Sequence, residues 1–149
     1  MSHISKSRKS FTHKTVITWN EKKKTFLCSL GKKTIEIAES LESKKHDDMW
    51  TPKELFVTSV EGFVKGAFID LAKKNGLEFL SYESTAQGVI EKVENKFRFA
   101  EIKVWPRIAI VSSGQIEKAK ELIELAGKNF FTSNFIRCKL SIYPEIKVE

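Results

Sequence analysis

The chain has 149 residues, of which 41% are hydrophobic and 11 are Phe, a composition that fits one folded domain and excludes a disordered protein. Its 26 Lys and Arg outnumber its 19 Asp and Glu, which gives a net charge of +7. No apolar run approaches the roughly 20 residues that span a bilayer, and the basic N-terminus lacks the apolar core of a secretory signal, so neither a transmembrane helix nor export is expected.

The N-terminal third predicts short strands after a basic tail. Residues 1–12 form this tail, and we expect a single domain over residues 13–149. Apolar side chains alternate along three segments, as in strands with one buried face. The segments run from Val16 to Asn20, from Phe26 to Leu30, where Gly31 ends the strand, and from Thr34 to Ala38. The polar stretch 40–50 predicts a loop.

A long helix is the most specific prediction. Thr51 is a good N-cap, Pro52 suits the first helical position, and Glu54 completes a capping box. Apolar residues then recur at steps of three and four, which places them on one wide face. The pair at positions 75–76, Asn-Gly, supplies a left-handed stop. The helix carries small residues that would let another backbone approach closely, namely Ser59, Gly62 and Gly66.

Two longer strands and a second helix follow. Residues 77–91 and 96–111 predict strands joined by a hairpin at 93–96, and Pro106 predicts a bend or an edge position. Ser112 or Ser113 can cap a second helix, whose apolar face consists of Ile116, Ala119, Ile123, Ala126 and Phe130. A final strand has Cys138, Leu140 and Ile142 on one side, with Ile146 and Val148 after Pro144. The order of elements is typical of an α+β fold with antiparallel hairpins.

Two stretches resemble the OsmC/Ohr superfamily of osmotically inducible and organic hydroperoxide resistance proteins. TPKELF at 51–56 is similar to the family's Asn/Thr-Pro-Glu-Glu/Gln-Leu-Phe/Leu helix start, and AGKNFFTSNF at 126–135 lies where the family has its second cysteine. The resemblance covers residues 34–143. It implies an OsmC/Ohr-like fold with antiparallel sheets, a long central helix and a second helix, in which two chains intertwine into a homodimer with each active site at the interface.

The resemblance also implies thiol peroxidase chemistry, but both redox cysteines are replaced. The family's first cysteine follows the small residue in the middle of the central helix, where this chain has Phe63 after Gly62. Alignment on Ser133 puts Phe130 at the second cysteine and Phe131 at the proline that follows it. Such a peroxidase needs a reachable thiolate stabilised by positive charge, and phenylalanine supplies neither a redox centre nor a charge.

The chain also departs from the family at the two residues that stabilise the family's thiolate. The glutamate that follows the helix proline is replaced by Lys53, with Glu54 one residue later. No arginine lies between Arg8 and Arg98 to match the family's arginine. We therefore expect no catalytic residue and no cofactor. The expected site is a remnant pocket at the dimer interface that binds an apolar small molecule, lined by Glu54, Glu61, Phe63, Lys65, Phe130 and Phe131.

The two cysteines leave an enzymatic alternative open. In this alternative the chain is an organic hydroperoxide reductase for oxidative-stress defence that uses Cys28 or Cys138. Both cysteines fall in register with large apolar residues on their strands, which favours buried, inert thiols. With two cysteines and no export signal, we expect a reducing, cytoplasmic location without disulfides.

The other charged residues give weaker signals. Glu61 and Lys65 lie four apart on the central helix and predict an ion pair. One histidine beside two aspartates, at 46–48, is too sparse for a metal site, so no metal is expected. The first 50 residues carry 11 basic against 6 acidic side chains, and only four basic residues of the whole chain are Arg. This favours a soluble surface; a nucleic-acid binder remains a second alternative, which we do not favour.

Overall fold

The computed structural model describes residues 9–39, 48–131 and 138–149, and the chain forms two compact units, Met1–Pro52 and Lys53–Glu149. Each unit is described by itself. No helix among the described residues is both long enough and apolar enough to cross a membrane. The predictions for residues 1–8, 40–47 and 132–137, which include His46, Asp47 and Ser133, lie outside the described residues.

The first unit contains a three-stranded antiparallel sheet in the order β1-β2-β3. Its strands are β1 (Val16–Trp19), β2 (Thr25–Cys28) and β3 (Ile35–Ile37), which confirms the three predicted strands. Asn20 shapes the first turn, because its side-chain oxygen accepts hydrogen bonds from the backbone N–H groups of Lys22 and Lys24 at 3.0 and 3.1 Å. Ile37 forms an isolated parallel bridge with Trp50 at the end of this unit.

The central helix α1 (Pro52–Lys74) begins and ends where the sequence predicts. Pro52 is its first residue, and Gly76 has the left-handed φ of 66° that ends it. The N–H of Leu77 donates to the carbonyl of Ala72 at 3.0 Å, as in a Schellman motif. The fully buried side chains of the helix are four residues apart: Val60, Val64, Phe68 and Ala72.

The second unit is built on a long hairpin formed by β4 (Phe79–Val93) and β5 (Lys96–Ile110). Its two-residue turn has positive φ at both Glu94 and Asn95, 50° and 64°, which matches the right-handed strand twist in a type I′ turn. The helix α2 (Ile116–Phe131) follows a 3-10 turn at Ser113–Gln115, and the chain ends in β6 (Lys139–Ile142) and β7 (Glu145–Val148).

The last two strands both pair with β5 in parallel, so this sheet is mixed rather than wholly antiparallel. β6 pairs with residues 101–104 of β5, and β7 pairs with residues 107–110. Pro106 therefore lies inside a central strand and not at an edge or a bend. It is tolerated there because it falls between the segments that pair with β6 and β7, where the ladder needs no N–H from it.

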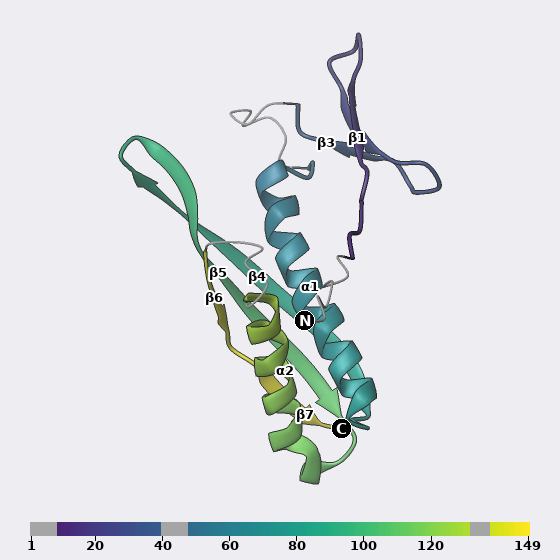
Figure 1. Cartoon of the computed structure of the whole chain (residues 1–149), viewed down its shortest axis with the longest axis vertical. Helices are drawn as coiled ribbons and strands as arrows, with labels where there is room; N and C mark the ends of the chain where they lie inside the picture. The colour runs from purple at the N-terminus through teal and green to yellow at the C-terminus, as the bar shows by residue number, and fades with distance from the viewer. Residues whose placement is uncertain (1–8, 40–47, 132–137) are drawn as a thin grey trace, which may run out of the picture. The chain divides into compact units, whose positions relative to one another are not determined.

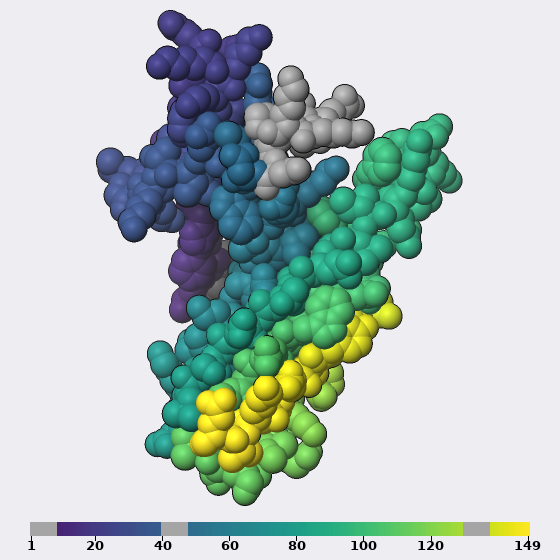
Figure 2. Space-filling model, turned by 180° about the vertical axis from the view of Figure 1, so that it is seen from behind, coloured from purple at the N-terminus to yellow at the C-terminus, as the bar shows by residue number. Residues whose placement is uncertain are grey.

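Both helices of this unit cover one face of its sheet (Figure 1). Alternate residues of β5 are buried against them, namely Ile102, Val104, Pro106, Ile108 and Ile110. The opposite face carries no helix and is seen in Figure 2, where β4 to β7 lie side by side. On this face Trp105 stacks on Tyr143, with ring centroids 5.5 Å apart, and Arg107 forms an ion pair with Glu145 at 3.2 Å.

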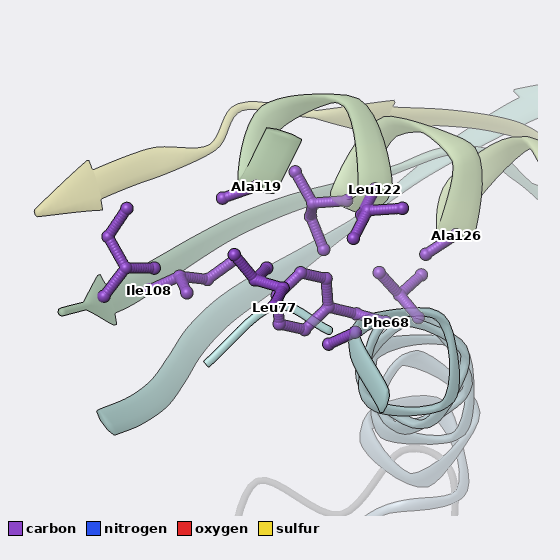
Figure 3. Packing of buried hydrophobic residues seen from close by; sticks show 10 residues of the cluster. Phe68, Leu77, Ile108, Ala119, Leu122 and Ala126 are labelled. Atoms are coloured by element: carbon purple, nitrogen blue, oxygen red, sulfur yellow. The ribbon is translucent and has the colours of Figure 1, made fainter. Parts of the chain in front are cut away.

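The main core lies between α1, α2 and β5 (Figure 3). Phe68 of α1 points into it and contacts the rings of Phe79 and Tyr82, with centroids 5.3 and 5.7 Å away. From α2, the predicted residues Ala119, Ile123 and Ala126 are buried, and so is Leu122, which the sequence analysis did not assign to the core. The predicted serine cap is corrected, because Ser112 precedes a 3-10 turn and makes no side-chain capping hydrogen bond.

Candidate functional site

The midpoint of α1 presents Phe63 on the side of the helix that the core does not cover. Phe63 leaves 51% of its surface exposed, although its helix neighbours Val60 and Val64 are buried, so it lies at the margin of the buried stripe. Gly62 and Gly66 flank it, and a Cβ added at either position would have no neighbouring atom within 4 Å. The helix therefore carries apolar and small residues on its outer side as well as its inner side, as a helix covered on both sides does.

The start of α1 does not bring all the predicted residues to Phe63. Lys53 and Glu54 are both exposed in the first turn. At 1.5 Å per residue, the nine residues from Glu54 to Phe63 correspond to about 14 Å along the axis, and at 3.6 residues per turn the two point to opposite sides of the helix. Lys53, ten residues before Phe63, lies nearer to the side of the helix that carries Phe63.

The side chain of Glu61 points toward the sheet and does not pair with Lys65. The hydroxyl of Ser84, on β4, donates to Oε1 of Glu61 at 2.6 Å, and Lys65 is exposed. Among the described residues no ion pair joins Glu61 to Lys65, so the predicted pair is wrong. Ser84 gives no signal in the sequence, because a contact between residues 23 apart leaves no local pattern.

Tyr82 lies beside this hydrogen bond, on the same face of β4. Its hydroxyl is buried and has no hydrogen-bond partner in the described part of the chain. Burial raises the pKa of Tyr82 to about 12, against a smaller lowering by the nearby hydroxyl of Ser84, and the negative charge of Glu61 adds to the rise. Glu61, Ser84 and Tyr82 thus form a small polar group between α1 and β4 that the sequence did not indicate.

The second predicted part of the pocket lies at the end of α2. Phe130 and Phe131 belong to the last turn of this helix, but their side chains lie outside what the structure describes. A pocket lined by Phe63 together with Phe130 and Phe131 therefore stays a prediction.

The two cysteines differ in their surroundings. Cys138 is buried, with 8% of its surface exposed, and it packs beside Val60, Ile102 and Val104. The predicted burial of Cys138 is confirmed. Burial raises the pKa of its thiol, which disfavours the thiolate, and its inertness stays a prediction. The prediction that Cys28 is buried is wrong, because this residue is only half-buried. Its thiol donates to the carbonyl of Val16 at 3.5 Å.

The geometry supports apolar contact rather than redox chemistry on α1. The helix contains no cysteine, and its outer side offers an aromatic ring between glycines. Among the described residues no group of three His, Cys, Asp or Glu is placed to hold a metal ion.

The chain has structural relatives but no match by sequence. No protein-family model matches it, and no curated protein matches it in sequence. An OsmC-like protein of unknown function from Vibrio cholerae has a similar structure, with a TM-score of 0.78 at 17% identity over 91% of this chain and 99% of that one. An OsmC-like protein from Mycoplasma pneumoniae gives 0.75 at 12% identity, over 93% and 99%.

An organic hydroperoxide resistance protein is also among these relatives. The protein from Elizabethkingia anophelis, whose structure has thiocyanate bound, gives a TM-score of 0.67 at 21% identity over 95% of this chain and 100% of that one. At such identities the likeness establishes the fold. The chain has the fold of OsmC-like and organic hydroperoxide resistance proteins, as the resemblance in its sequence predicts.

Proposed function

We propose that this chain is an OsmC/Ohr-type protein without thiol peroxidase activity. It acts as a cytoplasmic homodimer that binds an apolar small molecule beside Phe63. One observation carries the proposal: the helix position at which the resemblance implies the nucleophile is occupied by an aromatic ring that stays half exposed. A ring that leaves half of its surface exposed is suited to contact with a second apolar surface or ligand.

The N-terminal sheet supports the homodimer. On one face of this sheet Ile17 and Trp19 expose 64% and 61% of their surfaces, and they lie beside Leu27 and Ile35. A three-stranded sheet needs a covered apolar face to be stable. Only Thr25, Ile37 and Ala38 are buried among the described residues of this unit. A second copy of the chain would provide the cover that these side chains require.

The enzymatic alternative rests on Cys28. Cys138 is a poor candidate, because its thiol is buried and its raised pKa keeps it protonated. Cys28 is half-buried and reachable, and a reachable thiol is one of the two requirements for reaction with a peroxide. The alternative therefore makes a distinct prediction about this one residue.

Consumption of an organic hydroperoxide with a dithiol reductant separates the two functions. We expect no turnover above that of buffer in the wild type or in a Cys28→Ser variant. Turnover that disappears in Cys28→Ser would establish the peroxidase alternative and contradict the proposal. A Cys138→Ser variant serves as the matched control, because it removes the buried thiol and leaves Cys28 unchanged.

Sedimentation and dye binding test the proposed site itself. We expect the wild type to sediment as a dimer and to bind Nile red, a neutral apolar dye, and we expect Phe63→Ser to weaken both properties. Leu125→Ser is the control, because Leu125 is an exposed apolar residue on α2 and its substitution removes similar apolar surface. A monomeric wild type, or equal effects of the two substitutions, would overturn the assignment to Phe63.

A further inference from the structure

The N-terminal unit contains a small cavity that combines apolar walls with positive charge. Its volume is about 190 Å³. The residues that line it come from the ends of the three strands and from the turn between β2 and β3, and they are Thr15, Leu27, Cys28, Ser29, Lys32, Lys33 and Ile35. Two of them are lysines and none is acidic, so the cavity is cationic.

The turn after β2 sets the two lysines at the cavity. The N–H of Lys32 donates to the carbonyl of Ser29 at 3.1 Å, which closes a four-residue turn. Gly31 occupies its third position with a φ of 80°, as a type II turn requires. Because this turn is tight, Lys32 and Lys33 emerge beside the end of β2. Leu27 and Ile35 are directly paired across β2 and β3 and supply the apolar wall.

Two other polar side chains of the wall already donate hydrogen bonds to the backbone. The thiol of Cys28 donates to the carbonyl of Val16 at 3.5 Å, and the hydroxyl of Ser29 donates to the carbonyl of Lys14 at 3.3 Å. Within residues 9–39, 48–131 and 138–149, no carboxylate forms an ion pair with Lys32 or Lys33. The ammonium groups therefore remain available to a ligand.

We infer that this cavity binds a small amphipathic carboxylate, with its hydrocarbon part against Leu27 and Ile35 and its carboxylate at Lys32 and Lys33. Charge complementarity favours an anion, and the apolar wall favours one that carries hydrocarbon. A volume of about 190 Å³ lies well below the several hundred Å³ of sites for drug-sized ligands, so the ligand has one ring or one short chain. The inference is separate from the site proposed at Phe63, because no residue of the cavity belongs to α1, but Leu27 and Ile35 lie on the sheet face that the proposed homodimer would cover.

Protection of Cys28 from alkylation tests the inference. Because Cys28 lines the cavity and Cys138 is buried, a bound ligand shields one thiol and leaves the other as an internal reference. Iodoacetamide is a neutral reagent, so its approach does not depend on the lysines, and mass spectrometry locates the modified cysteine. We expect saturating hexanoate or benzoate to slow alkylation of Cys28 in the full chain at least several-fold, and we expect hexan-1-ol or inorganic phosphate to have little effect.

Charge reversal provides the matched variants. Lys32→Glu/Lys33→Glu should abolish the protection, measured as the ratio of rates with and without hexanoate in each variant. Lys22→Glu/Lys24→Glu changes the net charge equally on the other turn of the same sheet and should retain it, because neither lysine lines this cavity. Absence of protection in the wild type, equal protection by hexan-1-ol, protection by phosphate alone, or protection that survives Lys32→Glu/Lys33→Glu would each overturn the inference.

Discussion

At the scale of single residues, Tyr82 is the side chain with the most unusual surroundings. Its hydroxyl is buried without a hydrogen-bond partner among the described residues, which is uncommon because buried polar groups are nearly always paired. The phenolate is still less favourable there, since burial raises the pKa of Tyr82 from its ordinary value of 10.0 to about 12. The fold thus tolerates the neutral hydroxyl and opposes its ionisation.

This raised pKa predicts a loss of stability at alkaline pH. In the unfolded chain Tyr82 ionises near pH 10, whereas in the folded chain it ionises near pH 12. The contribution of this pKa difference to the free energy of unfolding is therefore constant below pH 10 and is lost between pH 10 and 12. Over this range we expect the wild type to lose about 1–2 kcal/mol relative to Tyr82→Phe, after allowance for partial exposure of the ring. Urea unfolding of both proteins from pH 8 to 12 measures the difference, and parallel curves would contradict the prediction.

Gly88 predicts a second residue-scale effect. A Cβ added there would lie 2.7 Å from a methyl group of Val57 and 2.8 Å from the ring of Phe99. Both side chains are stiff and packed, so we expect Gly88→Ala to lower the free energy of unfolding by about 1–3 kcal/mol. Gly114→Ala is the control, because its Cβ would make only an ordinary contact of 3.6 Å with Ser112. Denaturant unfolding compares the two, and equal effects would show that the close packing at Gly88 is relaxed without cost.

At the scale of elements, the two helices differ in how they meet their surroundings. Among the described side chains of α2, those on one side pack on the core, and those on the other side are exposed and polar, apart from Leu125. α1 has apolar residues on its inner side and again at Phe63 on its outer side. An amphipathic helix such as α2 needs one partner surface, whereas α1 has apolar surface left to cover.

Two leucines of α2 test this description. Leu122 is buried and Leu125, three residues later, is exposed. We expect Leu122→Ala to lower the free energy of unfolding by about 2–5 kcal/mol through lost burial and a residual cavity. Leu125→Ala should change it by less than about 1 kcal/mol. Thermal or urea unfolding gives both values, and a cost at Leu125 equal to that at Leu122 would mean that the outer side of α2 is covered.

At the scale of the whole molecule, the proposed homodimer makes stability depend on chain concentration. The exposed side chains Ile17, Trp19 and Phe63 indicate apolar surface that a second copy would bury. If folding and association are coupled, a hundredfold rise in chain concentration should stabilise the folded state by about 2.7 kcal/mol. We therefore expect the urea midpoint to rise with concentration in the wild type and to rise less in Phe63→Ser. A midpoint independent of concentration would show that the single chain is the stable unit.

The sequence by itself determined the elements, their order and the fold they resemble. These follow from local signals: Pro52 begins α1, Gly76 ends it, and the alternation of apolar residues marks the strands. The replacement of the family's cysteines by Phe63 and Phe130, which the alignment of two motifs predicts, stays a prediction.

Only the tertiary structure decided strand direction, contact and exposure. Strand periodicity is the same for both directions, so the sequence could not show that β6 and β7 run parallel to β5. It also could not show that Glu61 accepts a hydrogen bond from Ser84 and does not pair with Lys65, or that Phe63 and Cys28 are partly exposed. Burial and hydrogen bonding depend on which distant segments lie over a residue, and that is a property of the folded chain and not of its local pattern.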